Sequence, residues 1–197
     1  GKPKFTYDKR LEVAKKLRDA GCRALNFSLE SGNDEILEMM EKHVKKEYFA
    51  EQVKVLREVG IMSFCSVVFG YPTETRETIQ ETFDLCLQNR LYPSVGFLMP
   101  LPYTGMYDYA KKHGFITDED RYLDLITERQ DYTLNMTKMS DEEVKGQIKE
   151  NAIKLNKLLE LGLDESNFIK TGGARQHTNL KTHWKEKNAL DPDEIER

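Results

Sequence analysis

The sequence predicts an α/β fold in which parallel strands alternate with helices. Three strand-like runs, at residues 23–30, 61–69 and 94–99, are separated by stretches whose apolar residues recur at helical spacing. Strands that alternate with helices form parallel sheets, because each helix returns the chain to the same edge. Three strands are too few to close a barrel. The alternatives are a small open sheet or the C-terminal half of a larger domain, and we favour the second.

The first unit begins with a helical pattern between Tyr7 and Leu17, which Gly21 is expected to end. Residues 23–30 follow with strict alternation, which divides the side chains of a strand between two faces. The apolar face has Leu25, Phe27 and Leu29, and the polar face has Asn26, Ser28 and Glu30. Parallel strands are usually apolar on both faces. The polar face is therefore expected to look into a hydrated or ligand-filled space.

The second and third units follow the same plan. A helical pattern from Phe49 to Val59 ends at Gly60, and residues 61–69 are mostly apolar, as in a strand buried on both faces. Thr73 is the predicted N-cap of the next helix. Residues 94–99 form the third predicted strand between prolines, and residues 107–114 form a short helix.

The C-terminal part has a different pattern. Ser140 and Glu143 have the spacing of a capping box, which begins a predicted helix that Gly162 ends. The alternation at residues 132–139 predicts a packing strand, although this segment could also line a substrate entrance. We therefore divide the chain into a core at 1–116, a helical extension at 117–170 and a polar tail at 171–197 with little structure of its own.

Composition excludes several classes of protein. Apolar residues make up 39% of the 197 residues and charged residues 32%, which is typical of a soluble domain, and no apolar run is long enough to span a membrane. The net charge of −4 argues against a general nucleic-acid-binding surface. Cys22, Cys65 and Cys86 have neither the number nor the spacing of a disulfide framework or metal knuckle. A reducing cytoplasm fits this cysteine usage best.

Four motifs, in this order and at these spacings, resemble the radical SAM superfamily. They are Glu30-Ser31-Gly32, Lys42, Gly70-Tyr71-Pro72-Thr73-Glu74-Thr75 and Pro100-Leu101-Pro102-Tyr103-Thr104-Gly105. The resemblance covers roughly residues 5–116 and is greatest for the group that often has an N-terminal cobalamin-binding domain. It implies that the three βα units form half of an open (β/α) TIM-like barrel, to which the C-terminal helical extension is added.

The resemblance also implies contacts with S-adenosylmethionine (SAM). Ser28 and Glu30 would face the barrel lumen near the methionine part and ribose of SAM. Lys42 takes the place of a basic residue that reaches the SAM carboxylate, and Ser66 matches a polar position that hydrogen-bonds the ribose hydroxyls. Carboxylates and hydroxyls can share hydrogen bonds with such a diol.

The remaining implied contacts concern adenine. Val68 and Gly70 would lie along the base, with backbone groups reading its edge, and Leu98 or Met99 would pack on the ring. Taken alone, Glu30 and Lys42 also fit ordinary interactions with helix dipoles, and Glu74 is interpreted as a dipole partner rather than a catalyst.

The sequence also departs from the pattern of the superfamily. Thr73 replaces the usual glycine of its loop, and the triplet 103–105 replaces Pro-Gly-Thr. The cluster motif Cys-x-x-x-Cys-x-x-Cys and the Gly-Gly-Glu segment, which lie upstream in the superfamily, are absent from these residues. We therefore expect a fragment that is inactive by itself, with no metal ligand and no assigned catalytic residue. The [4Fe-4S] cluster, and cobalamin if it is used, would bind elsewhere in the intact protein.

The intact enzyme is expected to generate a 5′-deoxyadenosyl radical for hydrogen abstraction or methyl transfer, typically on a small molecule. The alternatives are a tRNA-modifying enzyme of the same superfamily and a non-catalytic α/β interaction module; a barrel hydrolase is disfavoured because no catalytic triad can be named. The expected partner is the missing N-terminal half. The open sheet edge is expected to be covered, either in a homodimer or by residues 117–197.

Overall fold

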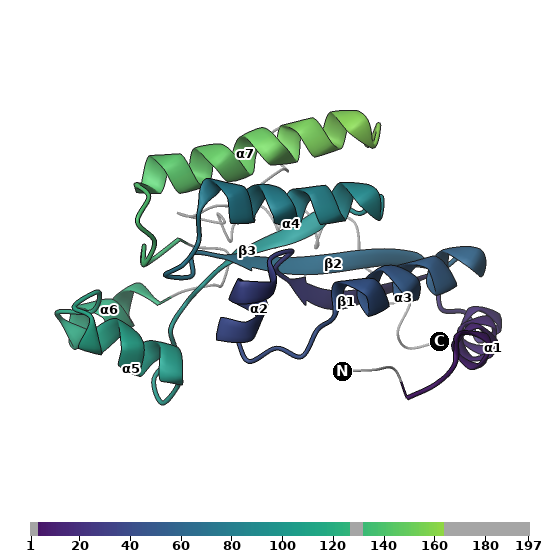
Figure 1. Cartoon of the computed structure of the whole chain (residues 1–197), viewed down its shortest axis with the longest axis horizontal. Coiled ribbons are helices and arrows are strands. Elements are labelled where there is room, and N and C mark those ends of the chain that lie inside the picture. The colour runs from purple at the N-terminus through teal and green to yellow at the C-terminus, as the bar shows by residue number, and fades with distance from the viewer. Residues whose placement is uncertain (1–3, 127–131, 164–197) are drawn as a thin grey trace, which may run out of the picture.

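The structure is a computed structural model that describes residues 4–126 and 132–163. Its centre is a sheet of three parallel strands in the order β1 (Ala24–Glu30), β2 (Met62–Phe69) and β3 (Pro93–Phe97), as Figure 1 shows. The predicted α/β fold with three parallel βα units is confirmed. The third strand begins at Pro93 and ends two residues before the predicted Met99.

Seven helices precede, connect or follow the strands within the described residues. They are α1 (Tyr7–Asp19), α2 (Asp34–Met39), α3 (Lys46–Glu58), α4 (Arg76–Gln88), α5 (Gly105–Lys112), α6 (Glu119–Leu125) and α7 (Asp141–Leu158). The capping box of Ser140 and Glu143 begins α7 as predicted. The N-cap of α4 is Thr75 rather than Thr73, because the Thr75 side chain accepts the Thr78 N–H. Helix α6 was not predicted.

The segment 132–139 is not the packing strand that its alternation suggested. Asn135 instead organises an irregular turn: its Oδ1 accepts the Thr137 N–H at 2.9 Å, and its Nδ2 donates to the Met139 carbonyl at 2.7 Å. Asn side chains favour such local bonds over a strand ladder. Tyr132 nevertheless packs on Phe97, with ring centroids 4.7 Å apart.

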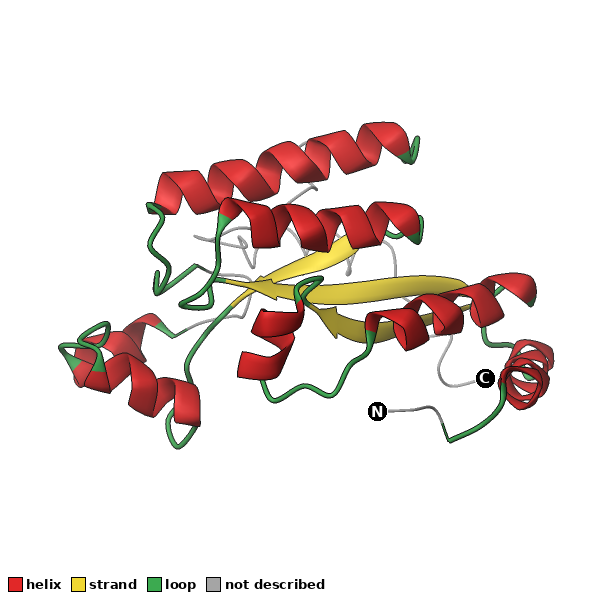
Figure 2. Ribbon diagram, in the orientation of Figure 1, coloured by secondary structure: helices red, strands yellow, loops and turns green. Residues whose placement is uncertain are grey.

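Helices α1, α3, α4 and α7 lie on one face of the sheet. Leu25 and Phe27 of β1 pack with residues of α1 and α3, and Val67 and Phe69 of β2 lie in the main core with α4 and α7. Figure 2 shows α4 and α7 as two layers on the same side of the strands. The predicted apolar face of residues 23–30 therefore lies under the helices.

Helix α7 packs on α4 and completes this core through apolar residues at helical spacing: Val144, Ile148, Ala152 and Leu155. Within the described residues, β1 pairs with β2 and has no strand on its other side. No strand of the described part of the extension pairs with this edge, and the predicted tail at 171–197 lies outside the described residues. No helix in the described part of the chain has the length and apolar character needed to cross a membrane.

Candidate functional site

The face of the sheet opposite the helices has a row of serines. In the parallel register, Ser28 of β1 is the partner of Ser66 of β2, and Ser66 is the partner of Ser94 of β3, so the three side chains share a face. Asn26 lies on the same face, where its Nδ2 donates to Ser66 Oγ at 3.3 Å. Ser66 is buried, whereas Ser28 and Ser94 are exposed. The predicted polar face is thus confirmed for Asn26 and Ser28.

Apolar side chains also lie on this open face. Phe64 is the register partner of Asn26, and Met62 lies two residues before it, so both point away from the helical side. Their exposed fractions are 46% for Phe64 and 62% for Met62. Exposed apolar side chains beside a polar row indicate a surface that is covered by something other than the described residues.

At the end of β1, Glu30 leaves the regular ladder. The register passes from Ser28–Ser66 directly to Glu30–Val67, which is a β-bulge, and Glu30 has a φ of 68°. Because the bulge breaks the alternation of side chains, the strand pairing alone does not place the Glu30 side chain on the same face as Ser28 and Ser66. Its carboxylate accepts a hydrogen bond from Lys42 Nζ at 3.2 Å.

Lys42 reaches Glu30 because α2 ends in a Schellman motif. The Lys42 N–H donates to the Leu37 carbonyl at 3.0 Å, the Glu41 N–H donates to the Glu38 carbonyl at 2.9 Å, and Glu41 has a φ of 54°. The reversal of the chain after α2 brings Lys42 back to the end of β1, where Glu30 lies. The two charges predicted to belong to one site are therefore in contact.

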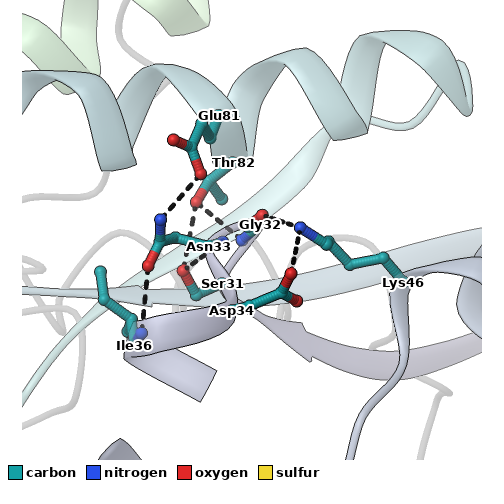
Figure 3. A network of polar contacts seen from close by, with 8 residues as sticks. All are labelled: Ser31, Gly32, Asn33, Asp34, Ile36, Lys46, Glu81 and Thr82. Carbon is teal, nitrogen blue, oxygen red and sulfur yellow. Dashed lines mark hydrogen bonds and ion pairs between the residues drawn. The ribbon is translucent and has the colours of Figure 1, made fainter. Parts of the chain in front are cut away.

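The loop between β1 and α2 is fixed to α4, as Figure 3 shows. The Gly32 N–H donates to Thr82 Oγ1 at 2.8 Å, and a Cβ on Gly32 would lie only 2.5 Å from Thr82 Cα. Lys46 Nζ donates to the Gly32 carbonyl at 3.3 Å and pairs with Asp34 at 2.9 Å. Asn33 caps α2 by accepting the Ile36 N–H at 3.1 Å. These contacts hold the backbone that follows Glu30.

The end of β2 is organised by Glu74, which the sequence suggested was a dipole partner. Its side chain is only 2% exposed and lies inside the loop. Glu74 Oε2 accepts the Gly70 N–H at 3.2 Å, and Oε1 accepts the Thr78 hydroxyl at 2.5 Å. Burial raises the pKa of Glu74 to about 7, against the lowering effect of these hydrogen bonds. Glu74 thus fixes the conformation of the loop between β2 and α4 from inside. The motif Gly70-Tyr71-Pro72-Thr73-Glu74-Thr75 gave only a weak indication of this role.

An apolar cluster stands at the ends of β2 and β3. Leu98 donates its N–H to the Phe69 carbonyl at 2.8 Å and packs in one cluster with Val68, Tyr71 and Tyr107. A Cβ on Gly70, which has a φ of 102°, would lie 3.8 Å from Leu98 Cβ. Val68, Gly70 and Leu98, three of the residues predicted to contact adenine, are therefore neighbours.

We define the strand-end site as the eight predicted residues: Ser28, Glu30, Lys42, Ser66, Val68, Gly70, Leu98 and Met99. The structure brings them into three groups, the Ser28–Ser66 pair, the Glu30–Lys42 pair and the apolar group around Leu98. Met99 is half-buried beside the last group. Sequence reasoning missed Ser94, because only the strand register places it beside Ser66.

The described residues contain no cluster of metal ligands. No group of three or more His, Cys, Asp or Glu side chains in residues 4–126 and 132–163 could hold a metal ion. Cys65 and Cys86 are buried in the core with their Sγ atoms 3.9 Å apart. The donor set needed for a [4Fe-4S] cluster is thus absent from this part of the chain.

Comparison with known proteins gives a family match and several relatives. Residues 3–86 match the family model described as the radical SAM superfamily. A Pyrococcus horikoshii protein described as an uncharacterized methyltransferase is 29% identical over 100 residues, which is 50% of this chain and 22% of that protein. The tRNA-2-methylthio-N(6)-dimethylallyladenosine synthase of Clostridium botulinum (strain Eklund 17B) is 32% identical over 95 residues, 46% of this chain and 21% of the synthase.

A solved structure is also similar to the chain. The radical SAM methyltransferase TsrM from Kitasatospora setae, solved with cobalamin and a [4Fe-4S] cluster, is 28% identical and matches with a TM-score of 0.46. The match covers 57% of this chain and 22% of TsrM. In each of these comparisons, the matched part is about a fifth of the length of the relative.

Proposed function

Residues 3–86 belong to the radical SAM superfamily, and from this premise we propose that the strand-end site binds SAM in a larger radical SAM enzyme. The superfamily implies SAM and a [4Fe-4S] cluster as cofactors. When bound to the intact enzyme, the cluster and SAM together supply a 5′-deoxyadenosyl radical. The residues of this chain bind and orient SAM, and the cluster ligands come from outside the described residues.

The Glu30–Lys42 pair fits the amino-acid part of SAM. A carboxylate and an ammonium group 3.2 Å apart at one strand end are complementary to the ammonium and carboxylate of a zwitterion. Glu30 accepts from the SAM ammonium group and Lys42 donates to its carboxylate, so the internal pair is exchanged for two pairs of the same kind. The loop contacts of Gly32 hold Glu30 in place for this exchange.

The serines and the apolar group fit the nucleoside part of SAM. Ser28 and Ser66 share hydrogen bonds with the ribose hydroxyls, because each serine hydroxyl both donates and accepts. Val68 and Leu98 pack against adenine and Met99 extends the apolar surface. Gly70, whose N–H is bonded to Glu74, offers its carbonyl to the base edge. The observation that carries this proposal is the presence of the serine pair and the charged pair at the end of the same strand, β1.

Isothermal titration calorimetry of the 197-residue chain with SAM tests this proposal. We expect saturable binding that Glu30→Gln weakens about tenfold, because a charge-assisted hydrogen bond is lost. Ser66→Ala is expected to weaken it by several-fold, because a neutral hydrogen bond contributes less. Glu142→Gln, an exposed position on α7, is the control and should bind as the unchanged chain does. Absence of saturable binding, or equal binding by the Glu30 variant and the control, would refute the assignment.

The reaction of the whole protein is proposed at a coarser level. The methyltransferase among the sequence relatives supports methyl transfer. A small-molecule substrate and cobalamin as a further cofactor stay predictions. The missing N-terminal half, a homodimer through the β1 edge and a cytoplasmic location all stay predictions. A non-catalytic interaction module stays the alternative if SAM does not bind.

The tRNA synthase among the relatives supports a second candidate, which is tRNA modification. Because phosphate contacts dominate nucleic-acid affinity, binding of tRNA should fall steeply with added salt. Electrophoretic mobility shift of unmodified tRNA at 50 and 200 mM salt tests this candidate with the full chain. The net charge of −4 leads us to expect no shift. A salt-sensitive shift at micromolar protein would instead favour the tRNA-modifying enzyme.

A further inference from the structure

A cleft of about 430 Å³ opens at the amino-terminal end of the strands, opposite the strand-end site. It lies where β1 and β2 begin, beside the C-terminal end of α3 and the turn after α4. Its walls include Arg23, Arg57, Gly60, Ser63 and Arg90. Its volume is within the range of sites that bind small molecules, about 300–1,000 Å³.

The charge of this cleft is strongly unbalanced. Three of the described residues that line it are arginines, and none is acidic. Arg23 Nη1 donates to the Arg18 and Cys22 carbonyls at 3.1 and 3.3 Å, and Arg57 Nη2 donates to the Asn89 carbonyl at 2.5 Å. A guanidinium group has five N–H donors, so both arginines retain donors for a ligand.

Two buried polar atoms beside the cleft have no partner. Ser63 Oγ and Arg18 Nη1 are among four such atoms in the described part of the chain. Ser63 lines the cleft, and Arg18 Nε lies 3.7 Å from where a Cβ on Gly60 would stand. Buried polar groups are normally hydrogen-bonded, so an unpaired group calls for an explanation such as a bound water or ion. Here two of them adjoin the same cationic cleft.

Capping of helix ends explains only part of this arrangement. Arg23 and Arg57 both donate to carbonyls near the C-terminal ends of helices, a favourable place for a cation. This explanation does not include Arg90, whose guanidinium has no hydrogen bond or ion pair with residues 4–126 or 132–163. Nor does it provide partners for Ser63 and Arg18.

We propose that this cleft binds the phosphate groups of a small phosphorylated molecule. Phosphate oxygens accept the paired N–H donors of guanidinium groups with matching geometry. A phosphate also has more negative charge to set against three arginines than a single carboxylate has. Arg57 and Arg90 are the principal donors, from the two walls formed by α3 and the turn after α4. The site is separate from the strand-end site and does not depend on the proposed function.

The test uses inorganic pyrophosphate as the probe and the full 197-residue chain. Isothermal titration calorimetry is expected to give saturable binding that Arg90→Gln weakens at least about tenfold, since a charged hydrogen-bond partner is lost. Arg121→Gln on the exposed side of α6 removes the same charge elsewhere and should leave the affinity unchanged. Sodium chloride at matched ionic strength controls for screening. If pyrophosphate shows no saturable binding, or if both variants lose the same affinity, the cleft is not a specific phosphate site and the proposal is wrong.

Ser63→Ala provides a second and independent measurement. Without pyrophosphate, the variant should have a higher midpoint of thermal unfolding, because an unpaired buried hydroxyl has been removed. With saturating pyrophosphate, its midpoint should rise less than that of the unchanged chain, because the ligand has lost one partner. If pyrophosphate raises both midpoints equally, Ser63 does not face the ligand and the proposed site is wrong.

Discussion

The stability of this protein is expected to fall between pH 5 and pH 8 because of Glu74. This carboxyl group is 2% exposed, and its burial raises its pKa from an ordinary value of 4.5 to about 7. In that interval the folded chain holds a proton that the unfolded chain has already released. Stability therefore decreases as pH rises, and the contribution is present in full below the unfolded pKa and lost above the folded one.

The size of this effect follows from the two pKa values. Each pH unit between them corresponds to about 1.4 kcal/mol, so the interval from 4.5 to about 7 is equivalent to about 3 kcal/mol. Glu74→Gln has a similar shape and no charge at any pH. The variant should lose some stability at low pH through altered hydrogen bonds with Gly70 and Thr78, but this loss should not vary with pH.

Urea unfolding of both chains at pH 5, 6, 7 and 8 measures this prediction. The free energy of unfolding of the unchanged chain, relative to Glu74→Gln, should fall by about 2.5 kcal/mol across the series, because part of the effect is already lost at pH 5. Taking the difference cancels the other titrating groups. Glu77→Gln on the same helical turn is the control, because the pKa of Glu77 is lowered by hydrogen bonding and this carboxyl stays charged throughout. A constant difference between the unchanged chain and Glu74→Gln from pH 5 to pH 8 would refute the reasoning.

Three further predictions concern the free energy of unfolding, measured with urea. Gly32→Ala should lower it by about 2–3 kcal/mol, because the new Cβ would stand 2.5 Å from Thr82 Cα; Gly105→Ala, with nothing within 4 Å, is the control, and equal effects would contradict the close packing. Ile148→Ala should lower it by about 2–5 kcal/mol, since this α7 residue is fully buried; a loss below 1 kcal/mol would mean that α7 is not part of the core. Tyr103→Gly should raise it by about 1 kcal/mol, because the exposed Tyr103 has a φ of 67°; a decrease would show that its side chain makes a contact.

Much of the fold could be predicted from the sequence because the relevant signals are local. Alternation predicted the two faces of β1 as far as Ser28, since successive side chains of a regular strand point to opposite faces. Gly21 and Gly60 were correctly placed at helix ends, where both have positive φ. Ser140 and Glu143 predicted the start of α7, because the hydrogen bonds of their capping box span only three residues.

Errors arose where two local signals competed. Thr73 and Thr75 are both acceptable N-caps of α4. Thr75 takes this position because the buried Glu74, through its bond with Gly70, fixes the path of the loop before the helix. The alternation at residues 132–139 resembled a strand, but no strand in residues 4–126 or 132–163 pairs with it. Hydrogen bonds of the Asn135 side chain fix the segment instead.

Only the tertiary structure decided how distant residues meet. Ser66 lies beside Ser28 because of the strand register, which is set by packing under α3 and α4 and not by either strand alone. The β-bulge at Glu30 and the burial of Glu74 likewise depend on contacts with other segments. The sequence by itself determined most of the strands and helices, with α6 and the segment 132–139 as exceptions, because backbone sterics and short-range hydrogen bonds act within a few residues. Register, burial and the pKa of a carboxyl group depend on neighbours brought together by folding, so they were decided by the packed structure.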